Sequence, residues 1–177
     1  MFIELERVPP EGRDIECSVP TESLGAESDV RFVEPVRISA RIVPLEHDRF
    51  RLSGGMDARV ETDCVRCLEP FPMTLHEALD LLYAPQSANV GPEGREDQEL
   101  ELEEEDMGVS FYSGDRIDLK QMIWEQVYLA LPMKPLCREG CLGLCQHCGT
   151  NLNLSKCGCA QDTVDPRLAS LKTLLKP

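Results

Sequence analysis

Apolar and polar residues alternate along three segments in the first half of the chain, at residues 30–43, 49–64 and 71–83. Even positions are mostly apolar in the first two segments, and odd positions are mostly apolar in the third. A period of two is typical of a β-strand that buries one face. The apolar positions are Val30, Phe32, Val36, Ile38, Ala40 and Ile42, then Phe50, Leu52, Met56, Ala58 and Val60, then Phe71, Met73, Leu75, Leu79, Leu81 and Tyr83. The pattern predicts an antiparallel meander of three long strands.

Two glycines interrupt the second segment without changing its phase. Because the alternation continues on both sides of Gly54 and Gly55, we expect one long strand bent at a glycine bulge, and not two strands joined by a turn. Shorter segments at residues 2–8 and 109–112 predict edge strands.

A helix is predicted after the strands. Asp118, with Gln121 three positions later, resembles the start of a capping box, and Pro132 marks the end of the helix. Its apolar stripe comprises Leu119, Met122, Ile123, Val127, Ala130 and Leu131. Trp124 and Tyr128 lie beside this stripe, where we expect core or rim residues, with a base-stacking platform as the less favoured alternative.

The C-terminal residues predict a second, short helix. Asp165 is a suitable cap, Pro166 suits the first helical turn, and a leucine stripe that should dock on the body follows. That stripe comprises Leu168, Leu171, Leu174 and Leu175. The whole pattern predicts an α+β fold, with an antiparallel β meander or partly open barrel, one packed helix, and a cysteine-rich metal-binding tail that ends in a short helix.

Charge divides the chain into two parts. Residues 1–131 contain 12 basic and 29 acidic residues, residues 132–177 contain six and three, and the net charge is −14. We therefore expect an acidic β body with one helix at 1–131, and a cysteine-rich, zinc-binding tail with the C-terminal helix at 132–177. Nine acidic residues between Glu93 and Asp106 predict a mobile acidic loop at about 85–107, with a docking strip for a basic protein segment as the alternative.

The sequence patterns also bear on location. The opening MFIELERVPPEG lacks the basic and apolar regions of a signal peptide, and no segment approaches the roughly 20 apolar residues of a membrane span. We expect a cytoplasmic protein that does not enter a membrane. In a reducing compartment, paired cysteines persist mainly as metal thiolates or transient redox couples, so disulfides are the least favoured interpretation of the nine cysteines.

Five of these cysteines lie in CLGLCQHCGTNLNLSKCGC, residues 141–159. Cys145 and Cys148 form a Cys-x-x-Cys turn followed by glycine, an arrangement that places both sulfurs on one side and points backbone amides at them. Cys157 and Cys159 provide a second close pair. Four thiolates match the tetrahedral coordination of a structural Zn²⁺ ion.

A second group of four uses cysteines from two distant segments. Cys64 and Cys67 lie where the long second strand ends, and Cys137 and Cys141 follow the first helix. Cys17 is left over and is interpreted as a buried or incidental thiol. Two zinc sites, one zinc site that borrows Cys141, and an iron–sulfur cluster all use the same residues and remain open alternatives. A bound metal would supply the folding free energy of residues 132–163, which are too polar to build a core.

Catalytic alternatives have weaker support. A thiol oxidoreductase needs Cys-x-x-Cys at a helix N-terminus, and neither pair opens a helical pattern. The sequence contains no glycine-rich phosphate loop and no Gly-x-Ser-x-Gly elbow, and no small-molecule substrate is evident. His147 lies inside a knuckle and could replace one cysteine as a ligand, whereas His47 falls in a predicted turn and His76 on a polar strand face.

Four stretches, in order, resemble one known family. These are CVRCLEPF, LALPMKPLC, CLGLCQHCGTNLN with CGC, and DPRLASLKTLL. Residues 34–177 thereby resemble the YceD-like family of large ribosomal RNA subunit accumulation proteins. The resemblance implies a non-enzymatic role in producing or accumulating that RNA, and it carries over no catalytic residues. The cysteines that match the family pattern are Cys64, Cys67, Cys137, Cys141, Cys145, Cys148, Cys157 and Cys159.

Three functional hypotheses follow. The first is a ribosome biogenesis factor whose acidic body engages a basic ribosomal protein, with the basic tail near the large-subunit ribosomal RNA precursor. The second is a zinc-ribbon nucleic-acid-binding or transcription-associated module, whose affinity would fall steeply with salt, a demand that a net charge of −14 makes hard to meet. The third is a thiol oxidoreductase, which requires a cysteine of low pKa.

Overall fold

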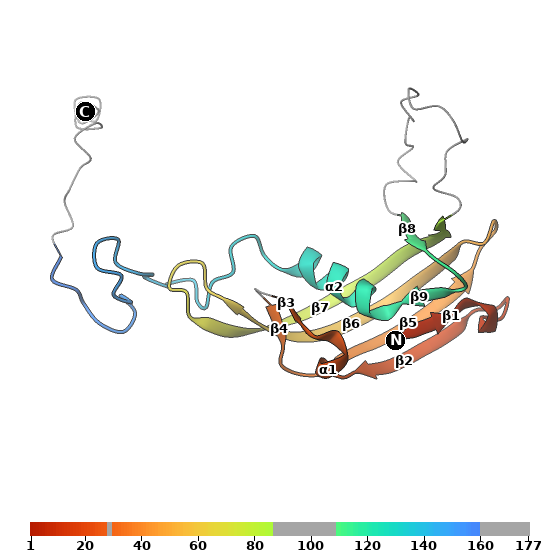
Figure 1. Cartoon of the computed structure of the whole chain (residues 1–177), viewed down its shortest axis with the longest axis horizontal. Helices are drawn as coiled ribbons and strands as arrows, with labels where there is room; N and C mark the ends of the chain where they lie inside the picture. Colours follow the sequence, from red (N-terminus) through yellow and green to blue (C-terminus); the bar gives the residue numbers. More distant parts are fainter. Residues whose placement is uncertain (28–29, 87–108, 160–177) are drawn as a thin grey trace, which may run out of the picture.

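The computed structural model describes residues 1–27, 30–86 and 109–159. Residues 87–107 of the predicted acidic loop, and the predicted C-terminal helix, lie outside these ranges. Within them, the predicted meander is confirmed (Figure 1). Strands β5 (Val36–Pro44), β6 (Phe50–Asp63) and β7 (Pro70–Pro85) pair in sequence order, each antiparallel to the one before it.

The first predicted strand is divided in two. Strand β4 (Val30–Phe32) and strand β5 both pair with the same edge of β6, and Glu34 and Pro35 form the break between them. Phe32 is opposite Val60, whereas Arg37 is opposite Asp57, so the break inserts two extra residues into this edge. An insertion of two residues preserves a period of two, which explains why the apolar phase continues across the break.

The predicted glycine bulge in β6 is wrong. The register with β7 runs without a slip from Phe50 opposite Tyr83 to Asp63 opposite Pro70, and the register with β5 is equally regular. Gly54 is needed for a different reason, since a Cβ atom there would lie 2.3 Å from the Ser39 carbonyl oxygen. A close approach of backbone is the second common reason for glycine within a strand.

Further short strands complete an open sheet. Strand β2 (Arg13–Val19) pairs with β5 at one edge, and strand β8 (Val109–Tyr112) pairs with the end of β7 at the other. The β7–β8 pair is parallel, which the long connection between the two strands allows. Strand β3 (Ala26–Glu27) pairs antiparallel with β4. The sheet does not close into a barrel within the described residues.

The N-terminal segment forms a separate small sheet. Strand β1 (Phe2–Glu4) pairs with β9 (Arg116–Asp118), so the predicted edge strand at residues 2–8 is shorter than expected and does not join the main sheet. A 3₁₀ turn η1 (Leu5–Arg7) follows β1, and a single helical turn α1 (Thr21–Leu24) follows β2.

Helix α2 (Leu119–Ala130) covers the apolar face of the sheet (Figure 1). Asp118 accepts a hydrogen bond from the Lys120 N–H at 2.9 Å, so the predicted cap is present. The capping box is not, because the Gln121 side chain donates to Glu125 instead. Trp124 is buried, and its indole N–H donates to the Leu24 carbonyl oxygen at 3.1 Å. The helix and the sheet thus share one hydrophobic core.

The opposite face of the sheet is polar and carries cross-strand ion pairs. Arg41 contacts Asp14 at 2.7 Å, and Arg51 contacts both carboxylate oxygens of Asp80 at 2.7 Å. Two further pairs join Arg31 to Glu61 and Arg59 to Glu34. Exposed pairs of this kind add about 0–1 kcal/mol each to stability. Their main effect is to neutralise four arginines of this face.

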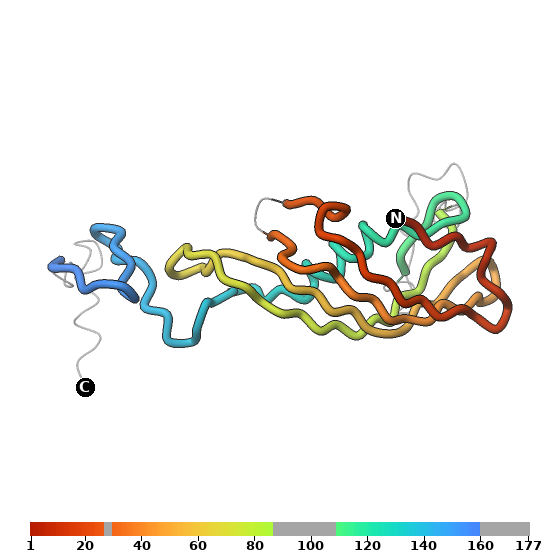
Figure 2. The backbone as a smooth tube through the Cα atoms, turned by 90° about the horizontal axis from the view of Figure 1, so that it is seen from below, coloured from red at the N-terminus to blue at the C-terminus, as the bar shows by residue number. Residues whose placement is uncertain are grey.

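The cysteine-rich segment continues beyond the turn that joins β6 to β7, at the opposite end of the sheet from the β5–β6 turn. Figure 2 shows this segment leaving the sheet after α2 and extending away from the main body. The end of the β6–β7 hairpin is therefore the part of the sheet that meets the cysteine-rich segment.

Candidate metal centres

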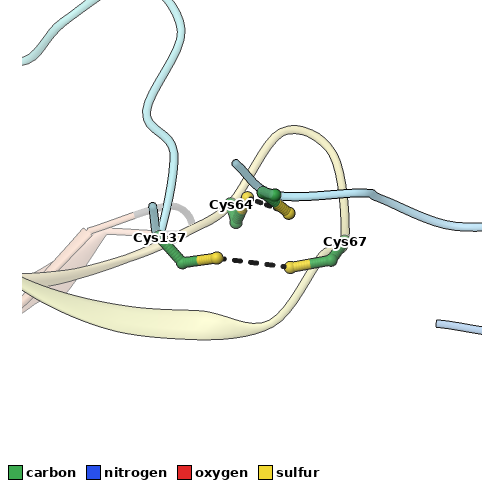
Figure 3. Close-up of side chains that lie close together, drawn as sticks. Cys64, Cys67 and Cys137 are labelled. Atoms are coloured by element: carbon green, nitrogen blue, oxygen red, sulfur yellow. Dashed lines mark hydrogen bonds between the residues drawn. The ribbon is translucent and has the colours of Figure 1, made fainter. Parts of the chain in front are cut away.

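The first cluster joins the β6–β7 turn to the segment after α2. Cys64 and Cys67 lie in the turn, and Cys137 and Cys141 come from the later segment. The sulfurs of Cys67 and Cys137 face each other at 3.8 Å (Figure 3), and those of Cys64 and Cys141 are also 3.8 Å apart. All four sulfur atoms lie within 4.8 Å of one another.

The second cluster is local in sequence. The sulfurs of Cys145, Cys148, Cys157 and Cys159 lie within 4.8 Å of one another, with 3.4 Å between Cys145 and Cys157. The N–H of His147 donates to the Cys145 sulfur at 3.4 Å. This is the backbone donor that the Cys-x-x-Cys-Gly pattern predicts.

Both Cys-x-x-Cys turns have the same backbone geometry. The Gly149 N–H donates to the Cys145 carbonyl oxygen at 2.9 Å, and the Leu68 N–H donates to the Cys64 carbonyl oxygen at 2.8 Å. The residue after the second cysteine is left-handed in both, with φ of 72° at Gly149 and 58° at Leu68. Leucine rarely adopts this conformation, so the knuckle geometry is imposed there against the residue's own preference.

The clusters differ in burial. Cys64, Cys67 and Cys141 are buried, and the side chains of Phe71 and Leu136 pack against them. In the second cluster Cys145 is buried, but Cys148 is exposed and Cys157 and Cys159 are half-buried. Among the described residues, the first cluster thus has an apolar backing that the second lacks.

The sulfur positions suit a single tetrahedral ion. With a zinc–sulfur bond of about 2.3 Å, tetrahedral geometry places sulfurs roughly 3.8 Å apart. The two contacts of 3.8 Å in the first cluster match this spacing. A disulfide needs about 2.05 Å, and all nine cysteines are free. A four-iron cluster would hold its thiolates farther apart, because each binds a different iron. Each cluster could therefore hold one metal ion.

One thiol in each cluster has a strongly lowered pKa. Burial raises the pKa of Cys64, but backbone N–H groups of the knuckle and of Cys137 outweigh it and bring the pKa to about 6. The hydroxyl group of Thr150, 3.2 Å from the Cys148 sulfur, and the Thr150 N–H lower the pKa of Cys148 to about 6. Both donors stabilise a thiolate, which is the form that binds metal.

Other thiols in the clusters are shifted the opposite way. Burial and the neighbouring sulfurs raise the pKa of Cys137 to about 12. Contact with Cys148, burial and the other sulfurs raise the pKa of Cys159 to about 12. Crowded thiolates repel one another, so protons remain on part of each set. A divalent cation is the group that would balance four thiolates at once.

The remaining candidates lie away from the clusters or contribute little to them. Cys17 is half-buried on β2 against the core, and burial raises its pKa. His147 offers its backbone N–H and is not grouped with the four sulfurs of its cluster. His76 contacts Asp57 at 2.6 Å, and His47 lies in the β5–β6 turn with φ of 60°.

Two polar residues near the sulfurs were not predicted as functional. Thr150 contacts Cys148, and the side-chain amide of Asn153 donates to the Cys141 sulfur at 3.3 Å. Both lie in the GTNLN stretch, which the sequence offered only as a mark of family resemblance. Their polarity in a cysteine-rich loop was the available signal.

A mostly antiparallel sheet with one covering helix, joined at its β6–β7 turn to a segment that completes two four-cysteine clusters, defines a sheet protein with a cysteine-organised appendage. Comparison with known families makes this specific. The chain belongs to the YceD family, described as "Large ribosomal RNA subunit accumulation protein YceD", whose sequence profile matches residues 52–175. The family's description states a role in RNA accumulation and no enzymatic reaction.

Individual relatives resemble large parts of the chain. The chain is 31% identical over 149 residues to an uncharacterized protein of Mycobacterium leprae, covering 84% of this chain and 63% of the relative. It is 36% identical over 127 residues to an uncharacterized protein of Mycobacterium tuberculosis, covering 71% and 56%. A chloroplastic protein of Zea mays, named "Large ribosomal RNA subunit accumulation protein YCED homolog 1", is 26% identical over 176 residues, covering 88% and 57%.

Two further findings concern the extent of these matches. The chain spans between 56% and 63% of the length of these three relatives. No solved structure matches the chain. Separately, none of the helices in the described part of the chain is both long and apolar enough to cross a membrane.

Proposed function

We propose that this chain is a non-enzymatic ribosome biogenesis factor that supports accumulation of large-subunit ribosomal RNA by binding a ribosomal protein or the precursor RNA. The family description names that role, and the plant relative carries it in its name. The structural observation that supports the proposal is the pair of four-cysteine clusters. They hold a segment that lacks a large apolar core of its own in a defined shape at the end of the sheet.

We further propose that the eight clustered cysteines bind two Zn²⁺ ions. The sulfur spacing, the backbone donors and the lowered thiol pKa values support this assignment. Zinc suits four thiolates in tetrahedral geometry, and its binding would contribute folding free energy to the segment. On this basis the chain divides into a β body at 1–131 and a zinc-organised tail at 132–177.

The sheet supports a basic protein as the partner of the body. Four arginines of its polar face are already paired with carboxylates, which leaves little positive charge to hold phosphates. Residues 1–131 contain 29 acidic and 12 basic residues, the charge balance that attracts a basic ribosomal protein. The tail, with six basic and three acidic residues, is the part better suited to lie near RNA.

A direct nucleic-acid-binding module is the alternative that the tail favours. It predicts an affinity that falls steeply as salt rises, because phosphate contacts release counterions. A thiol oxidoreductase would find thiols of low pKa at Cys64 and Cys148, but it has less support, since neither Cys-x-x-Cys pair in the described residues starts a helix. Reduced, metal-ready thiols suit a reducing compartment, and we propose the cytoplasm as the site of action.

The test is recovery of assembling large subunits with the tagged chain. We expect the wild-type chain to enrich one ribosomal protein or precursor RNA, and Cys64→Ser with Cys148→Ser to lose that enrichment. Cys17→Ser is the matched control, because Cys17 lies outside both clusters. Enrichment of neither ribosomal protein nor RNA by the wild-type chain would refute the ribosomal role.

A separate measurement addresses the metal. Native mass spectrometry with elemental analysis counts the ions per chain and identifies the element. We expect two zinc ions in the wild-type chain, one in each single-cluster variant, and two in Cys17→Ser. A chain isolated without chelators that contains no metal would refute zinc binding without bearing on the ribosomal role.

A further inference from the structure

The two cysteine clusters are in direct contact through the loops that carry them. Three residues, 142–144, separate the clusters along the chain. The Leu144 N–H donates to the Arg66 carbonyl oxygen in the first knuckle at 3.0 Å, and the Leu152 N–H donates to the Gly143 carbonyl oxygen at 2.9 Å. The connecting residues are therefore held between the β6–β7 turn and the loop of the second cluster.

Asn153 extends this contact to a sulfur atom. It belongs to the loop between Cys148 and Cys157 of the second cluster. Its Nδ2 atom nevertheless donates to the Cys141 sulfur of the first cluster at 3.3 Å. One cluster thus supplies a hydrogen-bond donor to a candidate ligand of the other.

The Asn153 amide is held in this orientation by its other contacts. Its Oδ1 atom accepts hydrogen bonds from the Leu142 N–H at 2.9 Å and from the Arg138 guanidinium at 2.7 Å. Its Nδ2 atom also donates to Asn151 Oδ1 at 2.9 Å. Because Leu142 and Arg138 can only donate here, they fix which end of the amide faces the sulfur.

We propose that Asn153 couples the two metal sites, so that an ion in the second cluster raises the affinity of the first for its own ion. The proposal rests on the zinc binding proposed above. An ion bound by Cys148 and Cys157 fixes the two ends of the loop that carries Asn153. The fixed amide then donates to the Cys141 thiolate, and donors of this kind tune the metal affinity of the ligands they contact.

Coupling of this kind is reciprocal. If the second ion strengthens binding of the first, the first must strengthen binding of the second by the same factor. Asn153 is thus a positioning residue that binds no metal itself. Its role differs from that of a loop spacer, because a spacer needs the loop's shape but not an N–H donor at Nδ2.

Asn153→Asp separates these two roles. The carboxylate keeps the shape of the amide and can accept from the Leu142 N–H and from Arg138. It cannot donate to the Cys141 sulfur, and its charge opposes the thiolate. Asn153→Ala removes all of these contacts and serves as the comparison. Cys148→Ser opens the second cluster and leaves the first set of four cysteines intact.

Site-resolved alkylation measures each cluster in the full chain. Cys137 and Cys148 are the exposed members of the first and second clusters, so each reports metal protection of its own site. The free Zn²⁺ concentration is buffered over a series, and mass spectrometry gives the concentration at which each thiol becomes half-protected from iodoacetamide.

We expect Asn153→Asp to raise the half-protection concentration at Cys137 by about 10-fold or more, the usual size of outer-shell effects. The same variant should raise it at Cys148, as reciprocity requires. Cys148→Ser should raise it at Cys137 to a similar extent, and adding Asn153→Asp to Cys148→Ser should change it no further.

Three results would overturn the coupling. If the half-protection concentration at Cys137 in Asn153→Asp lies within twofold of the wild-type value, no donor is needed. If only Asn153→Ala weakens zinc protection of Cys137, Asn153 only shapes the loop. Additive effects of Asn153→Asp and Cys148→Ser would show that the two act independently. Failure of zinc binding itself is recognised separately, because wild-type Cys137 and Cys148 would then show no zinc-dependent protection.

Discussion

Tyr83 provides a sharp test of how the core is packed. Its side chain is 4% exposed, and its hydroxyl group has no hydrogen-bond partner among the described residues. Leaving a buried hydroxyl group unpaired costs about 1–3 kcal/mol of folding free energy. Phenylalanine has nearly the same shape and no hydroxyl group. Tyr83→Phe should therefore raise the free energy of unfolding.

The expected gain is about 1–2 kcal/mol at pH 7, or roughly 2–8 °C in Tm for a chain of this size. Urea titration followed by circular dichroism measures it. Tyr112→Phe is the control, because the Tyr112 hydroxyl group donates to the Asp48 carbonyl oxygen at 2.8 Å. Losing that bond should lower stability by about 0.5–1.5 kcal/mol.

The pH dependence gives an independent check. Burial, followed by the nearby Glu125 carboxylate, raises the pKa of Tyr83 above its ordinary value of 10. Above pH 10 the unfolded chain releases this proton while the folded chain keeps it, so this contribution to stability is present below pH 10 and declines as pH rises. Tyr83→Phe should decline less steeply over pH 10–11. Destabilisation by Tyr83→Phe at pH 7 would refute the reasoning, since it would mean that the hydroxyl group is satisfied.

Three further predictions follow from the backbone and the clusters. Gly54→Ala should lower the free energy of unfolding by about 3 kcal/mol or more, because the new Cβ atom would clash with strand β5. Gly55→Ala is the control and should have a far smaller effect, because a Cβ atom there would lie 3.7 Å from the nearest atom. Equal losses of stability in the two variants would contradict the prediction. Leu68→Gly should be neutral or stabilising by up to about 1 kcal/mol, because glycine relieves the left-handed strain, and a clear loss of stability in urea titration would contradict it. Chelation should abolish hydrogen-exchange protection of the Gly149 amide, and retained protection would show that the knuckle forms without metal.

The period of two predicted the sheet well because it is a local consequence of one-sided burial. It gave the three long strands and the buried face, and it continued across Glu34 and Pro35 because the inserted residues number two. It could not show why Gly54 is glycine, since that depends on how closely β5 approaches. The pairing of β1 with β9 also escaped prediction, because three-residue strands carry too few positions to show a period.

Cysteine spacing indicated the composition of the clusters for a similar reason. Cys-x-x-Cys turns are local and readable, and the four other clustered cysteines add one pair to each turn, which gives two sets of four. The role of Asn153 was not readable, because its contact with Cys141 depends on two loops meeting in space. Burial of the first cluster against Phe71 and Leu136 likewise depends on where the segment after α2 returns to the sheet.

The two clusters should differ in what they contribute to the sheet. Cys67 and Cys137 are 70 positions apart, whereas Cys145 and Cys157 are 12 positions apart. By the chain-entropy estimate for cross-links, closing a loop of about 70 residues removes unfolded-state freedom equivalent to about 4 kcal/mol. An ion in the first cluster closes a loop that contains β7 and α2, so it would stabilise the body together with the tail. An ion in the second cluster closes only its own short loop. Among the described residues, that loop reaches the first cluster and the β6–β7 turn through Asn153, Asn151 and the residues that connect the clusters.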